Sequence, residues 1–248
     1  MRYLSAISTP TSAGQIEATI GAGLVRPLRP GEDPAALGGE RFAAIIADHA
    51  VQLPSLRHGL PVILVVSLHR GGLRQFRILA EDGIDVRLWS DCGGTLSETS
   101  LKCLAGTRAP TPAAAIVEHF RGRHGGLTAD ILTAAAILSS SRRSMDDMAR
   151  VCEASPSGIR NALRDSGLIS LSGVVARMRC LHALWALEGN RQNFWSAAGF
   201  RTLAELSAHL SQHSGAPLGR WKVQGGFGAL LESIDRDIHQ PEVEAAAG

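Results

Sequence analysis

Aromatic side chains, paired cysteines and long apolar runs are all scarce in this sequence. Aromatic residues make up 4% of the 248 residues, so the cores must be built mainly from aliphatic side chains. The four cysteines form no CxxC pair and have no histidine at metal-ligand spacing: Cys92, Cys103, Cys152 and Cys180. This pattern argues against a zinc site and favours free thiols. We therefore expect neither a bound metal nor a cofactor.

Features of exported and membrane proteins are missing as well. No apolar run approaches the roughly 18 residues of a membrane span. The first residues lack the basic and apolar regions of a secretory signal peptide. Together with cysteines that suit a reducing compartment, this predicts a cytoplasmic protein without a membrane partner.

Charge is distributed unevenly along the chain. Residues 1–106 carry 10 basic and 10 acidic side chains, residues 107–222 carry 14 basic and 8 acidic, and residues 223–248 carry 1 basic and 5 acidic. The middle segment is therefore the one suited to a polyanion. With its prolines and glycines, 107–126 reads as a linker, which leaves domains at 1–106 and 127–222. The last segment, 223–248, is predicted to be a disordered acidic tail.

The N-terminal domain alternates short apolar runs with helical segments. Helices are expected at Gln15–Ile20 and Leu73–Glu81. Strands are expected at Arg2–Ser8, Leu24–Leu28, Phe42–Ala47, Val62–Ser67 and Val86–Trp89. Continuous β-branched runs separated by helices are typical of a parallel sheet that is covered on both faces. This predicts an α/β domain.

This pattern resembles the flavodoxin-like receiver domain of bacterial response regulators. Asp48 stands where that family has its phosphoacceptor, and Ser67 stands at the family's Ser/Thr position. However, Ser8-Thr9-Pro10 replaces the acidic pair that holds a cation, and Ser90-Asp91 stands where the family has a lysine. Without those groups, nothing neutralises the charge of a transferring phosphoryl group. We expect a degenerate receiver-like domain that self-associates, rather than phosphorylation of Asp48.

The first part of the C-terminal domain has the pattern of a helix-turn-helix. A support helix at Thr128–Ser139 precedes a helix at Met145–Cys152. Ser155 and Pro156 are the N-cap and first position of the next helix, Ser157–Asp165. That helix is expected to expose Ser157, Arg160, Asn161 and Arg164. Arginine pairs with guanine and asparagine with adenine, so this face suits base edges in a major groove.

A second unit of the same kind follows a long helix at Val174–Glu188, whose polar side carries Arg177 and Arg179. The second unit comprises a helix at Gln192–Ala198, a turn at Gly199-Phe200 and a helix at Thr202–His213. The last helix is expected to bury Leu203, Leu206 and Leu210 and to expose Glu205, Ala208, His209 and Gln212.

Two such units joined by a long helix resemble the DNA-binding domain of the AraC family of transcription regulators. The resemblance is carried by the family's Gly-Phe, apolar, apolar, Gly, aromatic series, here Gly199, Phe200, Leu206, Leu210, Gly215 and Trp221. It implies an all-α double helix-turn-helix. The sequence departs from the family at Trp195, where the family has a small alanine. It also lacks Arg and Lys in the second recognition helix.

The expected function is therefore sequence-specific transcription regulation rather than catalysis. The residues expected to contact DNA are Ser155, Ser157, Arg160, Asn161, Arg164, Arg177, Arg201, Thr202, Ser207 and Gln212. The expected partners are double-stranded DNA, a second copy through the N-terminal domain, and RNA polymerase. Two alternatives stay open, a regulator that has lost DNA binding and acts through protein contacts, and an enzyme that uses Asp48.

Overall fold

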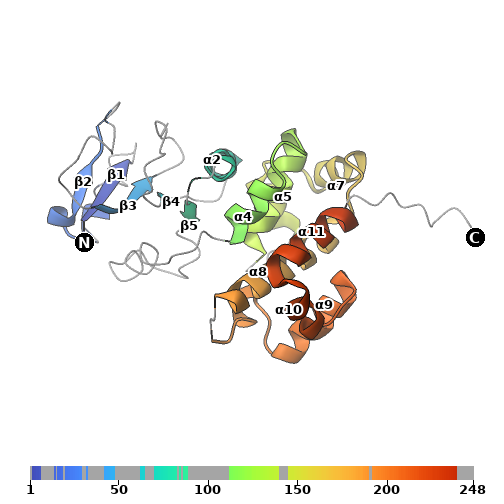
Figure 1. The fold of residues 1–248 in the computed structure, drawn as a ribbon. Helices are drawn as coiled ribbons and strands as arrows, with labels where there is room; N and C mark the ends of the chain where they lie inside the picture. The colour runs from blue at the N-terminus through green and yellow to red at the C-terminus, as the bar shows by residue number, and fades with distance from the viewer. Residues whose placement is uncertain are drawn as a thin grey trace, which may run out of the picture. The chain divides into compact units, whose positions relative to one another are not determined.

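The computed structural model combines an α/β unit with a helical unit (Figure 1). It describes residues 2–6, 14, 16–18, 20–29, 32, 42–47, 62–64, 70–82, 84, 86–88, 112–139, 145–189 and 192–238. The two compact units are Met1–Glu118 and His119–Gly248, so their boundary falls within the predicted linker and within α4 (Pro112–His119). None of the helices in the described ranges is long and apolar enough to cross a membrane.

The first unit contains a five-stranded sheet in which neighbouring strands run parallel. The strands are β1 (Arg2–Ala6), β2 (Val25–Pro27), β3 (Phe42–Ala47), β4 (Val62–Leu64) and β5 (Val86–Leu88). Their order in the sheet is β2-β1-β3-β4-β5. A 3-10 turn, η1 (Ala22–Leu24), leads into β2, and helix α2 (Arg70–Glu81) packs against β5. The predicted parallel strands are therefore present, and the predicted extensions of β1, β4 and β5 lie outside the described residues.

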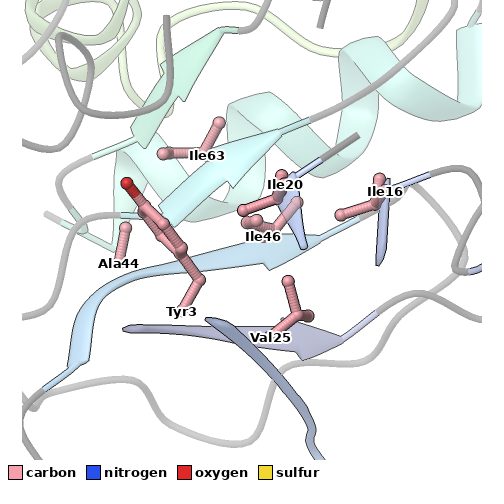
Figure 2. Close-up of a cluster of buried hydrophobic side chains, with 7 residues drawn as sticks. All are labelled: Tyr3, Ile16, Ile20, Val25, Ala44, Ile46 and Ile63. Atoms are coloured by element: carbon pink, nitrogen blue, oxygen red, sulfur yellow. The ribbon is translucent and has the colours of Figure 1, made fainter. Parts of the chain in front are cut away.

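Both faces of this sheet are buried, as the continuous apolar runs predict. Because side chains alternate along a strand, Leu4 and Ile45 lie on the face opposite to Tyr3 and Ile46, and all four are fully buried. Figure 2 shows the cluster on the Tyr3 face, which consists of Tyr3, Ile16, Ile20, Val25, Ala44, Ile46 and Ile63. Ile16 and Ile20, both in helical conformation, contribute to this cluster and therefore lie over β1 and β3.

The second unit is built around α8 (Leu171–Glu188). This helix packs against α5 (Gly126–Leu138), α7 (Pro156–Asp165), η4 (Ser196–Ala198), α9 (Leu203–Ser214) and α11 (Gly226–Ile238). The other helices of the unit are α6 (Met145–Val151) and α10 (Leu218–Gln224). Val174, Met178, Leu181 and Leu184 are fully buried, since α8 is covered on several sides at once.

His182 is one of several polar side chains buried in this unit. The imidazole of His182 on α8 is buried, and its Nε2 donates to the carbonyl oxygen of Ala136 on α5 at 2.7 Å. Burial lowers the pKa of His182 to about 4, so the ring is neutral in the folded protein near pH 7. The hydrogen bond therefore ties α5 to α8 without burying a charge.

The prediction of a disordered tail at 223–248 is wrong for most of that segment. Residues 218–224 complete α10, and 226–238 form α11, which packs against α8 and α10. Its buried side chains are Phe227, Leu230, Leu231, Ile234 and Ile238. Their spacing of three, four and seven residues is an amphipathic helical pattern, which outweighs the acidic charge of the opposite face. Residues 239–248 lie outside the described residues.

The start of α11 is capped by α8. Glu188 Oε1, at the last residue of α8, accepts a hydrogen bond from the backbone N–H of Phe227 at 2.5 Å. Gly225 and Gly226 both have positive φ, 111° and 61°, which favours glycine at this junction. A Cβ atom on Gly226 would collide with the Glu188 carboxylate. The two glycines thus allow the chain to turn and the carboxylate to approach the helix end.

Replacing Leu230 with alanine tests whether α11 belongs to the core. Leu230 is fully buried, so Leu230→Ala should lower the free energy of unfolding by about 2–5 kcal/mol in urea denaturation. Arg236→Ala, at an exposed position of the same helix, should change it by less than about 0.5 kcal/mol. Equal effects of the two substitutions would contradict the placement of α11.

Burial of the His182 ring predicts a loss of stability in acid. Its folded pKa of about 4 lies below the ordinary value of 6.5, so between those pH values the unfolded chain gains a proton that the folded chain does not. The free energy of unfolding should therefore fall by roughly 3 kcal/mol as the pH drops through this window. His182→Gln keeps an N–H donor without a titrating group. Urea denaturation should show a shallower pH dependence for this variant, and an unchanged dependence would exclude His182 as the cause.

Candidate nucleic-acid interface

The turn between α6 and α7 has the geometry that the sequence predicts. Glu153 has a φ of 51°, a left-handed conformation that ends α6. Ser155 is the N-cap of α7, with its Oγ accepting from the backbone N–H of Gly158 at 3.0 Å. Pro156 occupies the first position, where a missing N–H costs nothing. These residues fix the start of α7 relative to α6.

The inner side of α7 is anchored to α5. Ile159 and Leu163 are buried, and α6 and α7 both pack on α5. Thr128 Oγ1 on α5 donates to the Ala162 carbonyl at 3.3 Å and lies 2.9 Å from the hydroxyl of Ser166. The helix is therefore held by groups that its outer face does not use.

The outer face of α7 carries the four predicted polar side chains, and all four are exposed: Ser157, Arg160, Asn161 and Arg164. Arg164 Nη2 donates to Asn161 Oδ1 at 3.1 Å, and Arg164 Nε lies 3.5 Å from Asp165 Oδ1. Among the described residues, no ion pair involves Arg160. The structure thus brings two guanidinium groups and one amide together on one exposed surface.

The predicted helix at Gln192–Ala198 is wrong. Residues 192–195 form turns, and only Ser196–Ala198 form a helical segment, the 3-10 turn η4. Asn193 has a φ of 54°, which a continuing right-handed helix does not allow. Phe194 is buried with Trp195 against its edge at a ring distance of 5.3 Å. The space that two aromatic rings require explains why this segment departs from a regular helix.

Arg179 of α8 holds the turn that follows η4. Its Nε donates to the Ala198 carbonyl and its Nη2 to the Gly199 carbonyl, both at 3.1 Å. Its guanidinium lies 4.2 Å from the centre of the Phe200 ring. A cation is favourable at carbonyls that end a helical turn, and also over an aromatic face. The sequence places Arg179 on the polar side of α8 but gives no sign of this role, since its partners follow about 20 residues later.

Helix α9 begins one residue after the predicted start, with Thr202 as its N-cap, and two of its side chains are oriented differently from the prediction. Thr202 Oγ1 accepts from the Glu205 N–H at 3.1 Å, and Leu206 and Leu210 are buried as predicted. Leu203, predicted to be buried, is 43% exposed. His209, predicted to be exposed, is half-buried with Nε2 3.3 Å from the Ala176 carbonyl of α8. Burial and then the nearby His213 ring lower the pKa of His209.

The remaining predicted contact residues differ in accessibility. Arg201 and Gln212 are exposed, whereas Ser207 is half-buried. Glu205 is partly exposed, and its carboxylate accepts from the Arg201 backbone N–H at 2.7 Å. Arg177 is half-buried, and its Nη1 donates to the Gly173 carbonyl of its own helix at 3.4 Å. The second helix-turn-helix segment therefore presents fewer free polar groups than the first.

Two other sequence expectations concern metals and phosphorylation. Asp48, the phosphoacceptor position, lies outside the described residues. In the described ranges, no three His, Cys, Asp or Glu side chains are grouped closely enough to hold a metal ion. The rings of His209 and His213 lie 4.4 Å apart and are tilted by 54° to one another.

Substitution of Arg179 tests its structural role. Arg179→Gln removes the guanidinium that bonds both carbonyls and lies over Phe200, so the free energy of unfolding should fall by roughly 2 kcal/mol in urea denaturation. Arg177→Gln is the matched control, because the Arg177 hydrogen bond to Gly173 stays within α8. Its effect should be less than half as large. Equal losses would show that Arg179 does not hold the turn.

Comparisons with known proteins add nothing to this geometry. No family model, curated protein or solved structure matches the chain. A functional assignment therefore depends on the residues and contacts described above.

Proposed function

We propose that this protein is a sequence-specific DNA-binding transcription regulator of the AraC type, in which α7 reads base edges in a major groove. The observation that carries the proposal is the outer face of α7, where Arg160, Asn161 and Arg164 are exposed together. Arginine bonds guanine and asparagine bonds adenine through two contacts each. These side chains take no part in the packing of α7, so a ligand is a natural reason for their grouping.

The packing of the helical unit is compatible with two DNA-reading helices, α7 and α9. Both α7 and α9 pack on α8, which fixes their relative position. They lie at opposite ends of the helical unit in Figure 1. Two helices held this way suit two half-elements about one helical turn apart on DNA. The surplus of basic over acidic side chains in residues 107–222, 14 against 8, favours a polyanionic partner.

For the N-terminal unit, Met1–Glu118, we propose a flavodoxin-like, receiver-like module that self-associates and transmits a signal to the helical unit. Its parallel strand order, β2-β1-β3-β4-β5, is one of the common orders of doubly wound sheets. In such sheets the order reverses between β1 and β3, and ligands bind at the carboxyl ends of those strands. Contact with RNA polymerase is part of the same proposal.

One observation favours a second candidate, a regulator that acts through protein contacts and has lost DNA binding. The outer face of α9 carries no Arg or Lys, and the helix that would support it is reduced to turns and η4. Salt dependence separates the two candidates. DNA binding weakens steeply as salt rises because counterions are released, whereas the second candidate requires no such response.

The test is selection of bound duplexes from a random pool with the full chain, followed by titration at fixed and varied salt. We expect a motif with two half-elements and affinity that falls steeply with salt. Arg160→Ala together with Arg164→Ala should abolish sequence-specific binding, since each base contact contributes about 1–3 kcal/mol.

Arg121→Ala together with Arg236→Ala removes the same charge from exposed positions outside α7 and is the control. It should retain the sequence preference. If the α7 variant binds the selected duplex as tightly as the unaltered protein at the same salt, the assignment of α7 is wrong.

A further inference from the structure

A pocket lies where the last turn of α8 meets α10 and the start of α11. Its volume is about 250 Å³, and the residues that line it are Leu184, Leu187, Glu188, Lys222, Gly225 and Gly226. All of them belong to the second compact unit, so the pocket lies within one unit. Pockets that hold drug-sized ligands measure roughly 300–1,000 Å³, so this pocket suits a smaller molecule.

The pocket combines two opposite charges with apolar walls. Glu188 and Lys222 are both exposed, whereas Leu184 is fully buried and Leu187 is half-buried. Glu188 Oε1 accepts from the Phe227 N–H, and no other described residue donates to this carboxylate. Neither charged side chain forms an ion pair with the other or with any residue in the described part of the chain. One carboxylate oxygen and one ammonium group therefore remain available to a ligand.

Both charges are held in place by neighbouring groups. The Glu188 carboxylate is fixed by its bond to the Phe227 N–H, at 2.5 Å, and fills the space where a Cβ atom on Gly226 would stand. Lys222 Nζ lies 5.9 Å from the centre of the Phe194 ring, a distance at which a cation is attracted to an aromatic face. Side chains that are already held lose less freedom when a ligand binds, which favours binding.

We propose that this pocket binds a small zwitterion, an α-amino acid with an aliphatic side chain. The ligand's ammonium group donates to Glu188 Oε2, Lys222 Nζ donates to its carboxylate, and its side chain contacts Leu184 and Leu187. Hydrogen bonds between charged groups are about twice as strong as those between neutral groups, so the two ends of the ligand fix its orientation. The inference goes beyond the proposed DNA-binding function and does not depend on it, because neither charged residue is among the expected DNA contacts.

The experiment is isothermal titration calorimetry of the full chain with leucine, valine, isoleucine and methionine, together with thermal unfolding at rising ligand concentration. At least one of these amino acids should bind saturably at one site and raise the Tm, because a ligand of the folded state stabilises it by mass action. For leucine, the matched probes are isopentylamine, which lacks the carboxylate, and isocaproate, which lacks the ammonium group. Each should bind about tenfold more weakly, since each loses one hydrogen bond between charged groups.

Substitutions at the two charged residues test the assignment of the site. Glu188→Gln removes the charge but keeps an oxygen that can accept from the Phe227 N–H, and Lys222→Met removes the ammonium group. Each should weaken binding of the amino acid about tenfold. Arg220→Met is the matched control, because it removes a cation from an exposed position of α10 that does not line the pocket. Its affinity should equal that of the unaltered protein.

Three results would overturn the proposal. The first is that none of the four amino acids gives heat or raises the Tm at millimolar concentrations. The second is that isopentylamine or isocaproate binds as tightly as leucine. The third is that the Glu188 and Lys222 variants, with circular dichroism spectra like that of the unaltered protein, bind the amino acid with full affinity. None of these results bears on DNA binding by α7, so the two proposals stand or fail separately.

Discussion

The arrangement of the helical unit depends on the packing of α8 against five other elements. Its apolar side chains, including Met178 and Leu181, are fully buried, so α8 cannot move without disturbing all of its neighbours. Two polar side chains on the same helix also form hydrogen bonds to its neighbours. His182 bonds a carbonyl of α5, and Arg179 bonds two carbonyls of the turn that follows η4. One helix therefore positions both outer faces on which the proposed function depends.

The two outer faces differ in the side chains that they expose, although both helices have a hydroxyl side chain as their N-cap. On α7, the cap uses Ser155, and the charged side chains beyond it remain exposed. On α9, Thr202 and Glu205 both accept from backbone N–H groups, and the exposed side chains are uncharged. In the proposed complex with DNA, the first face supplies hydrogen-bond specificity. Phosphate contacts from nearby cations would set the register.

Local signals in the sequence predicted the elements whose causes are local. Apolar runs gave the strands, and Ser155-Pro156 gave the start of α7 together with its exposed polar face. The signals failed where distant residues decide the outcome. The acidic charge of 223–248 predicts disorder, but α11 forms there because its apolar residues have helical spacing and pack against α8. The inward turn of His209 depends on a carbonyl of α8, and the role of Arg179 depends on carbonyls about 20 residues away. No short window of sequence contains those partners.

The Glu188 carboxylate has a consequence for how the helical unit opens. A negative charge at the carboxyl end of α8 is unfavourable for the dipole of that helix, but it is favourable at the amino end of α11. The last turn of α8 and the first turn of α11 are therefore each stabilised by the presence of the other. Fraying of one end removes the support of the other, so the two ends should separate as one cooperative event rather than unravel independently.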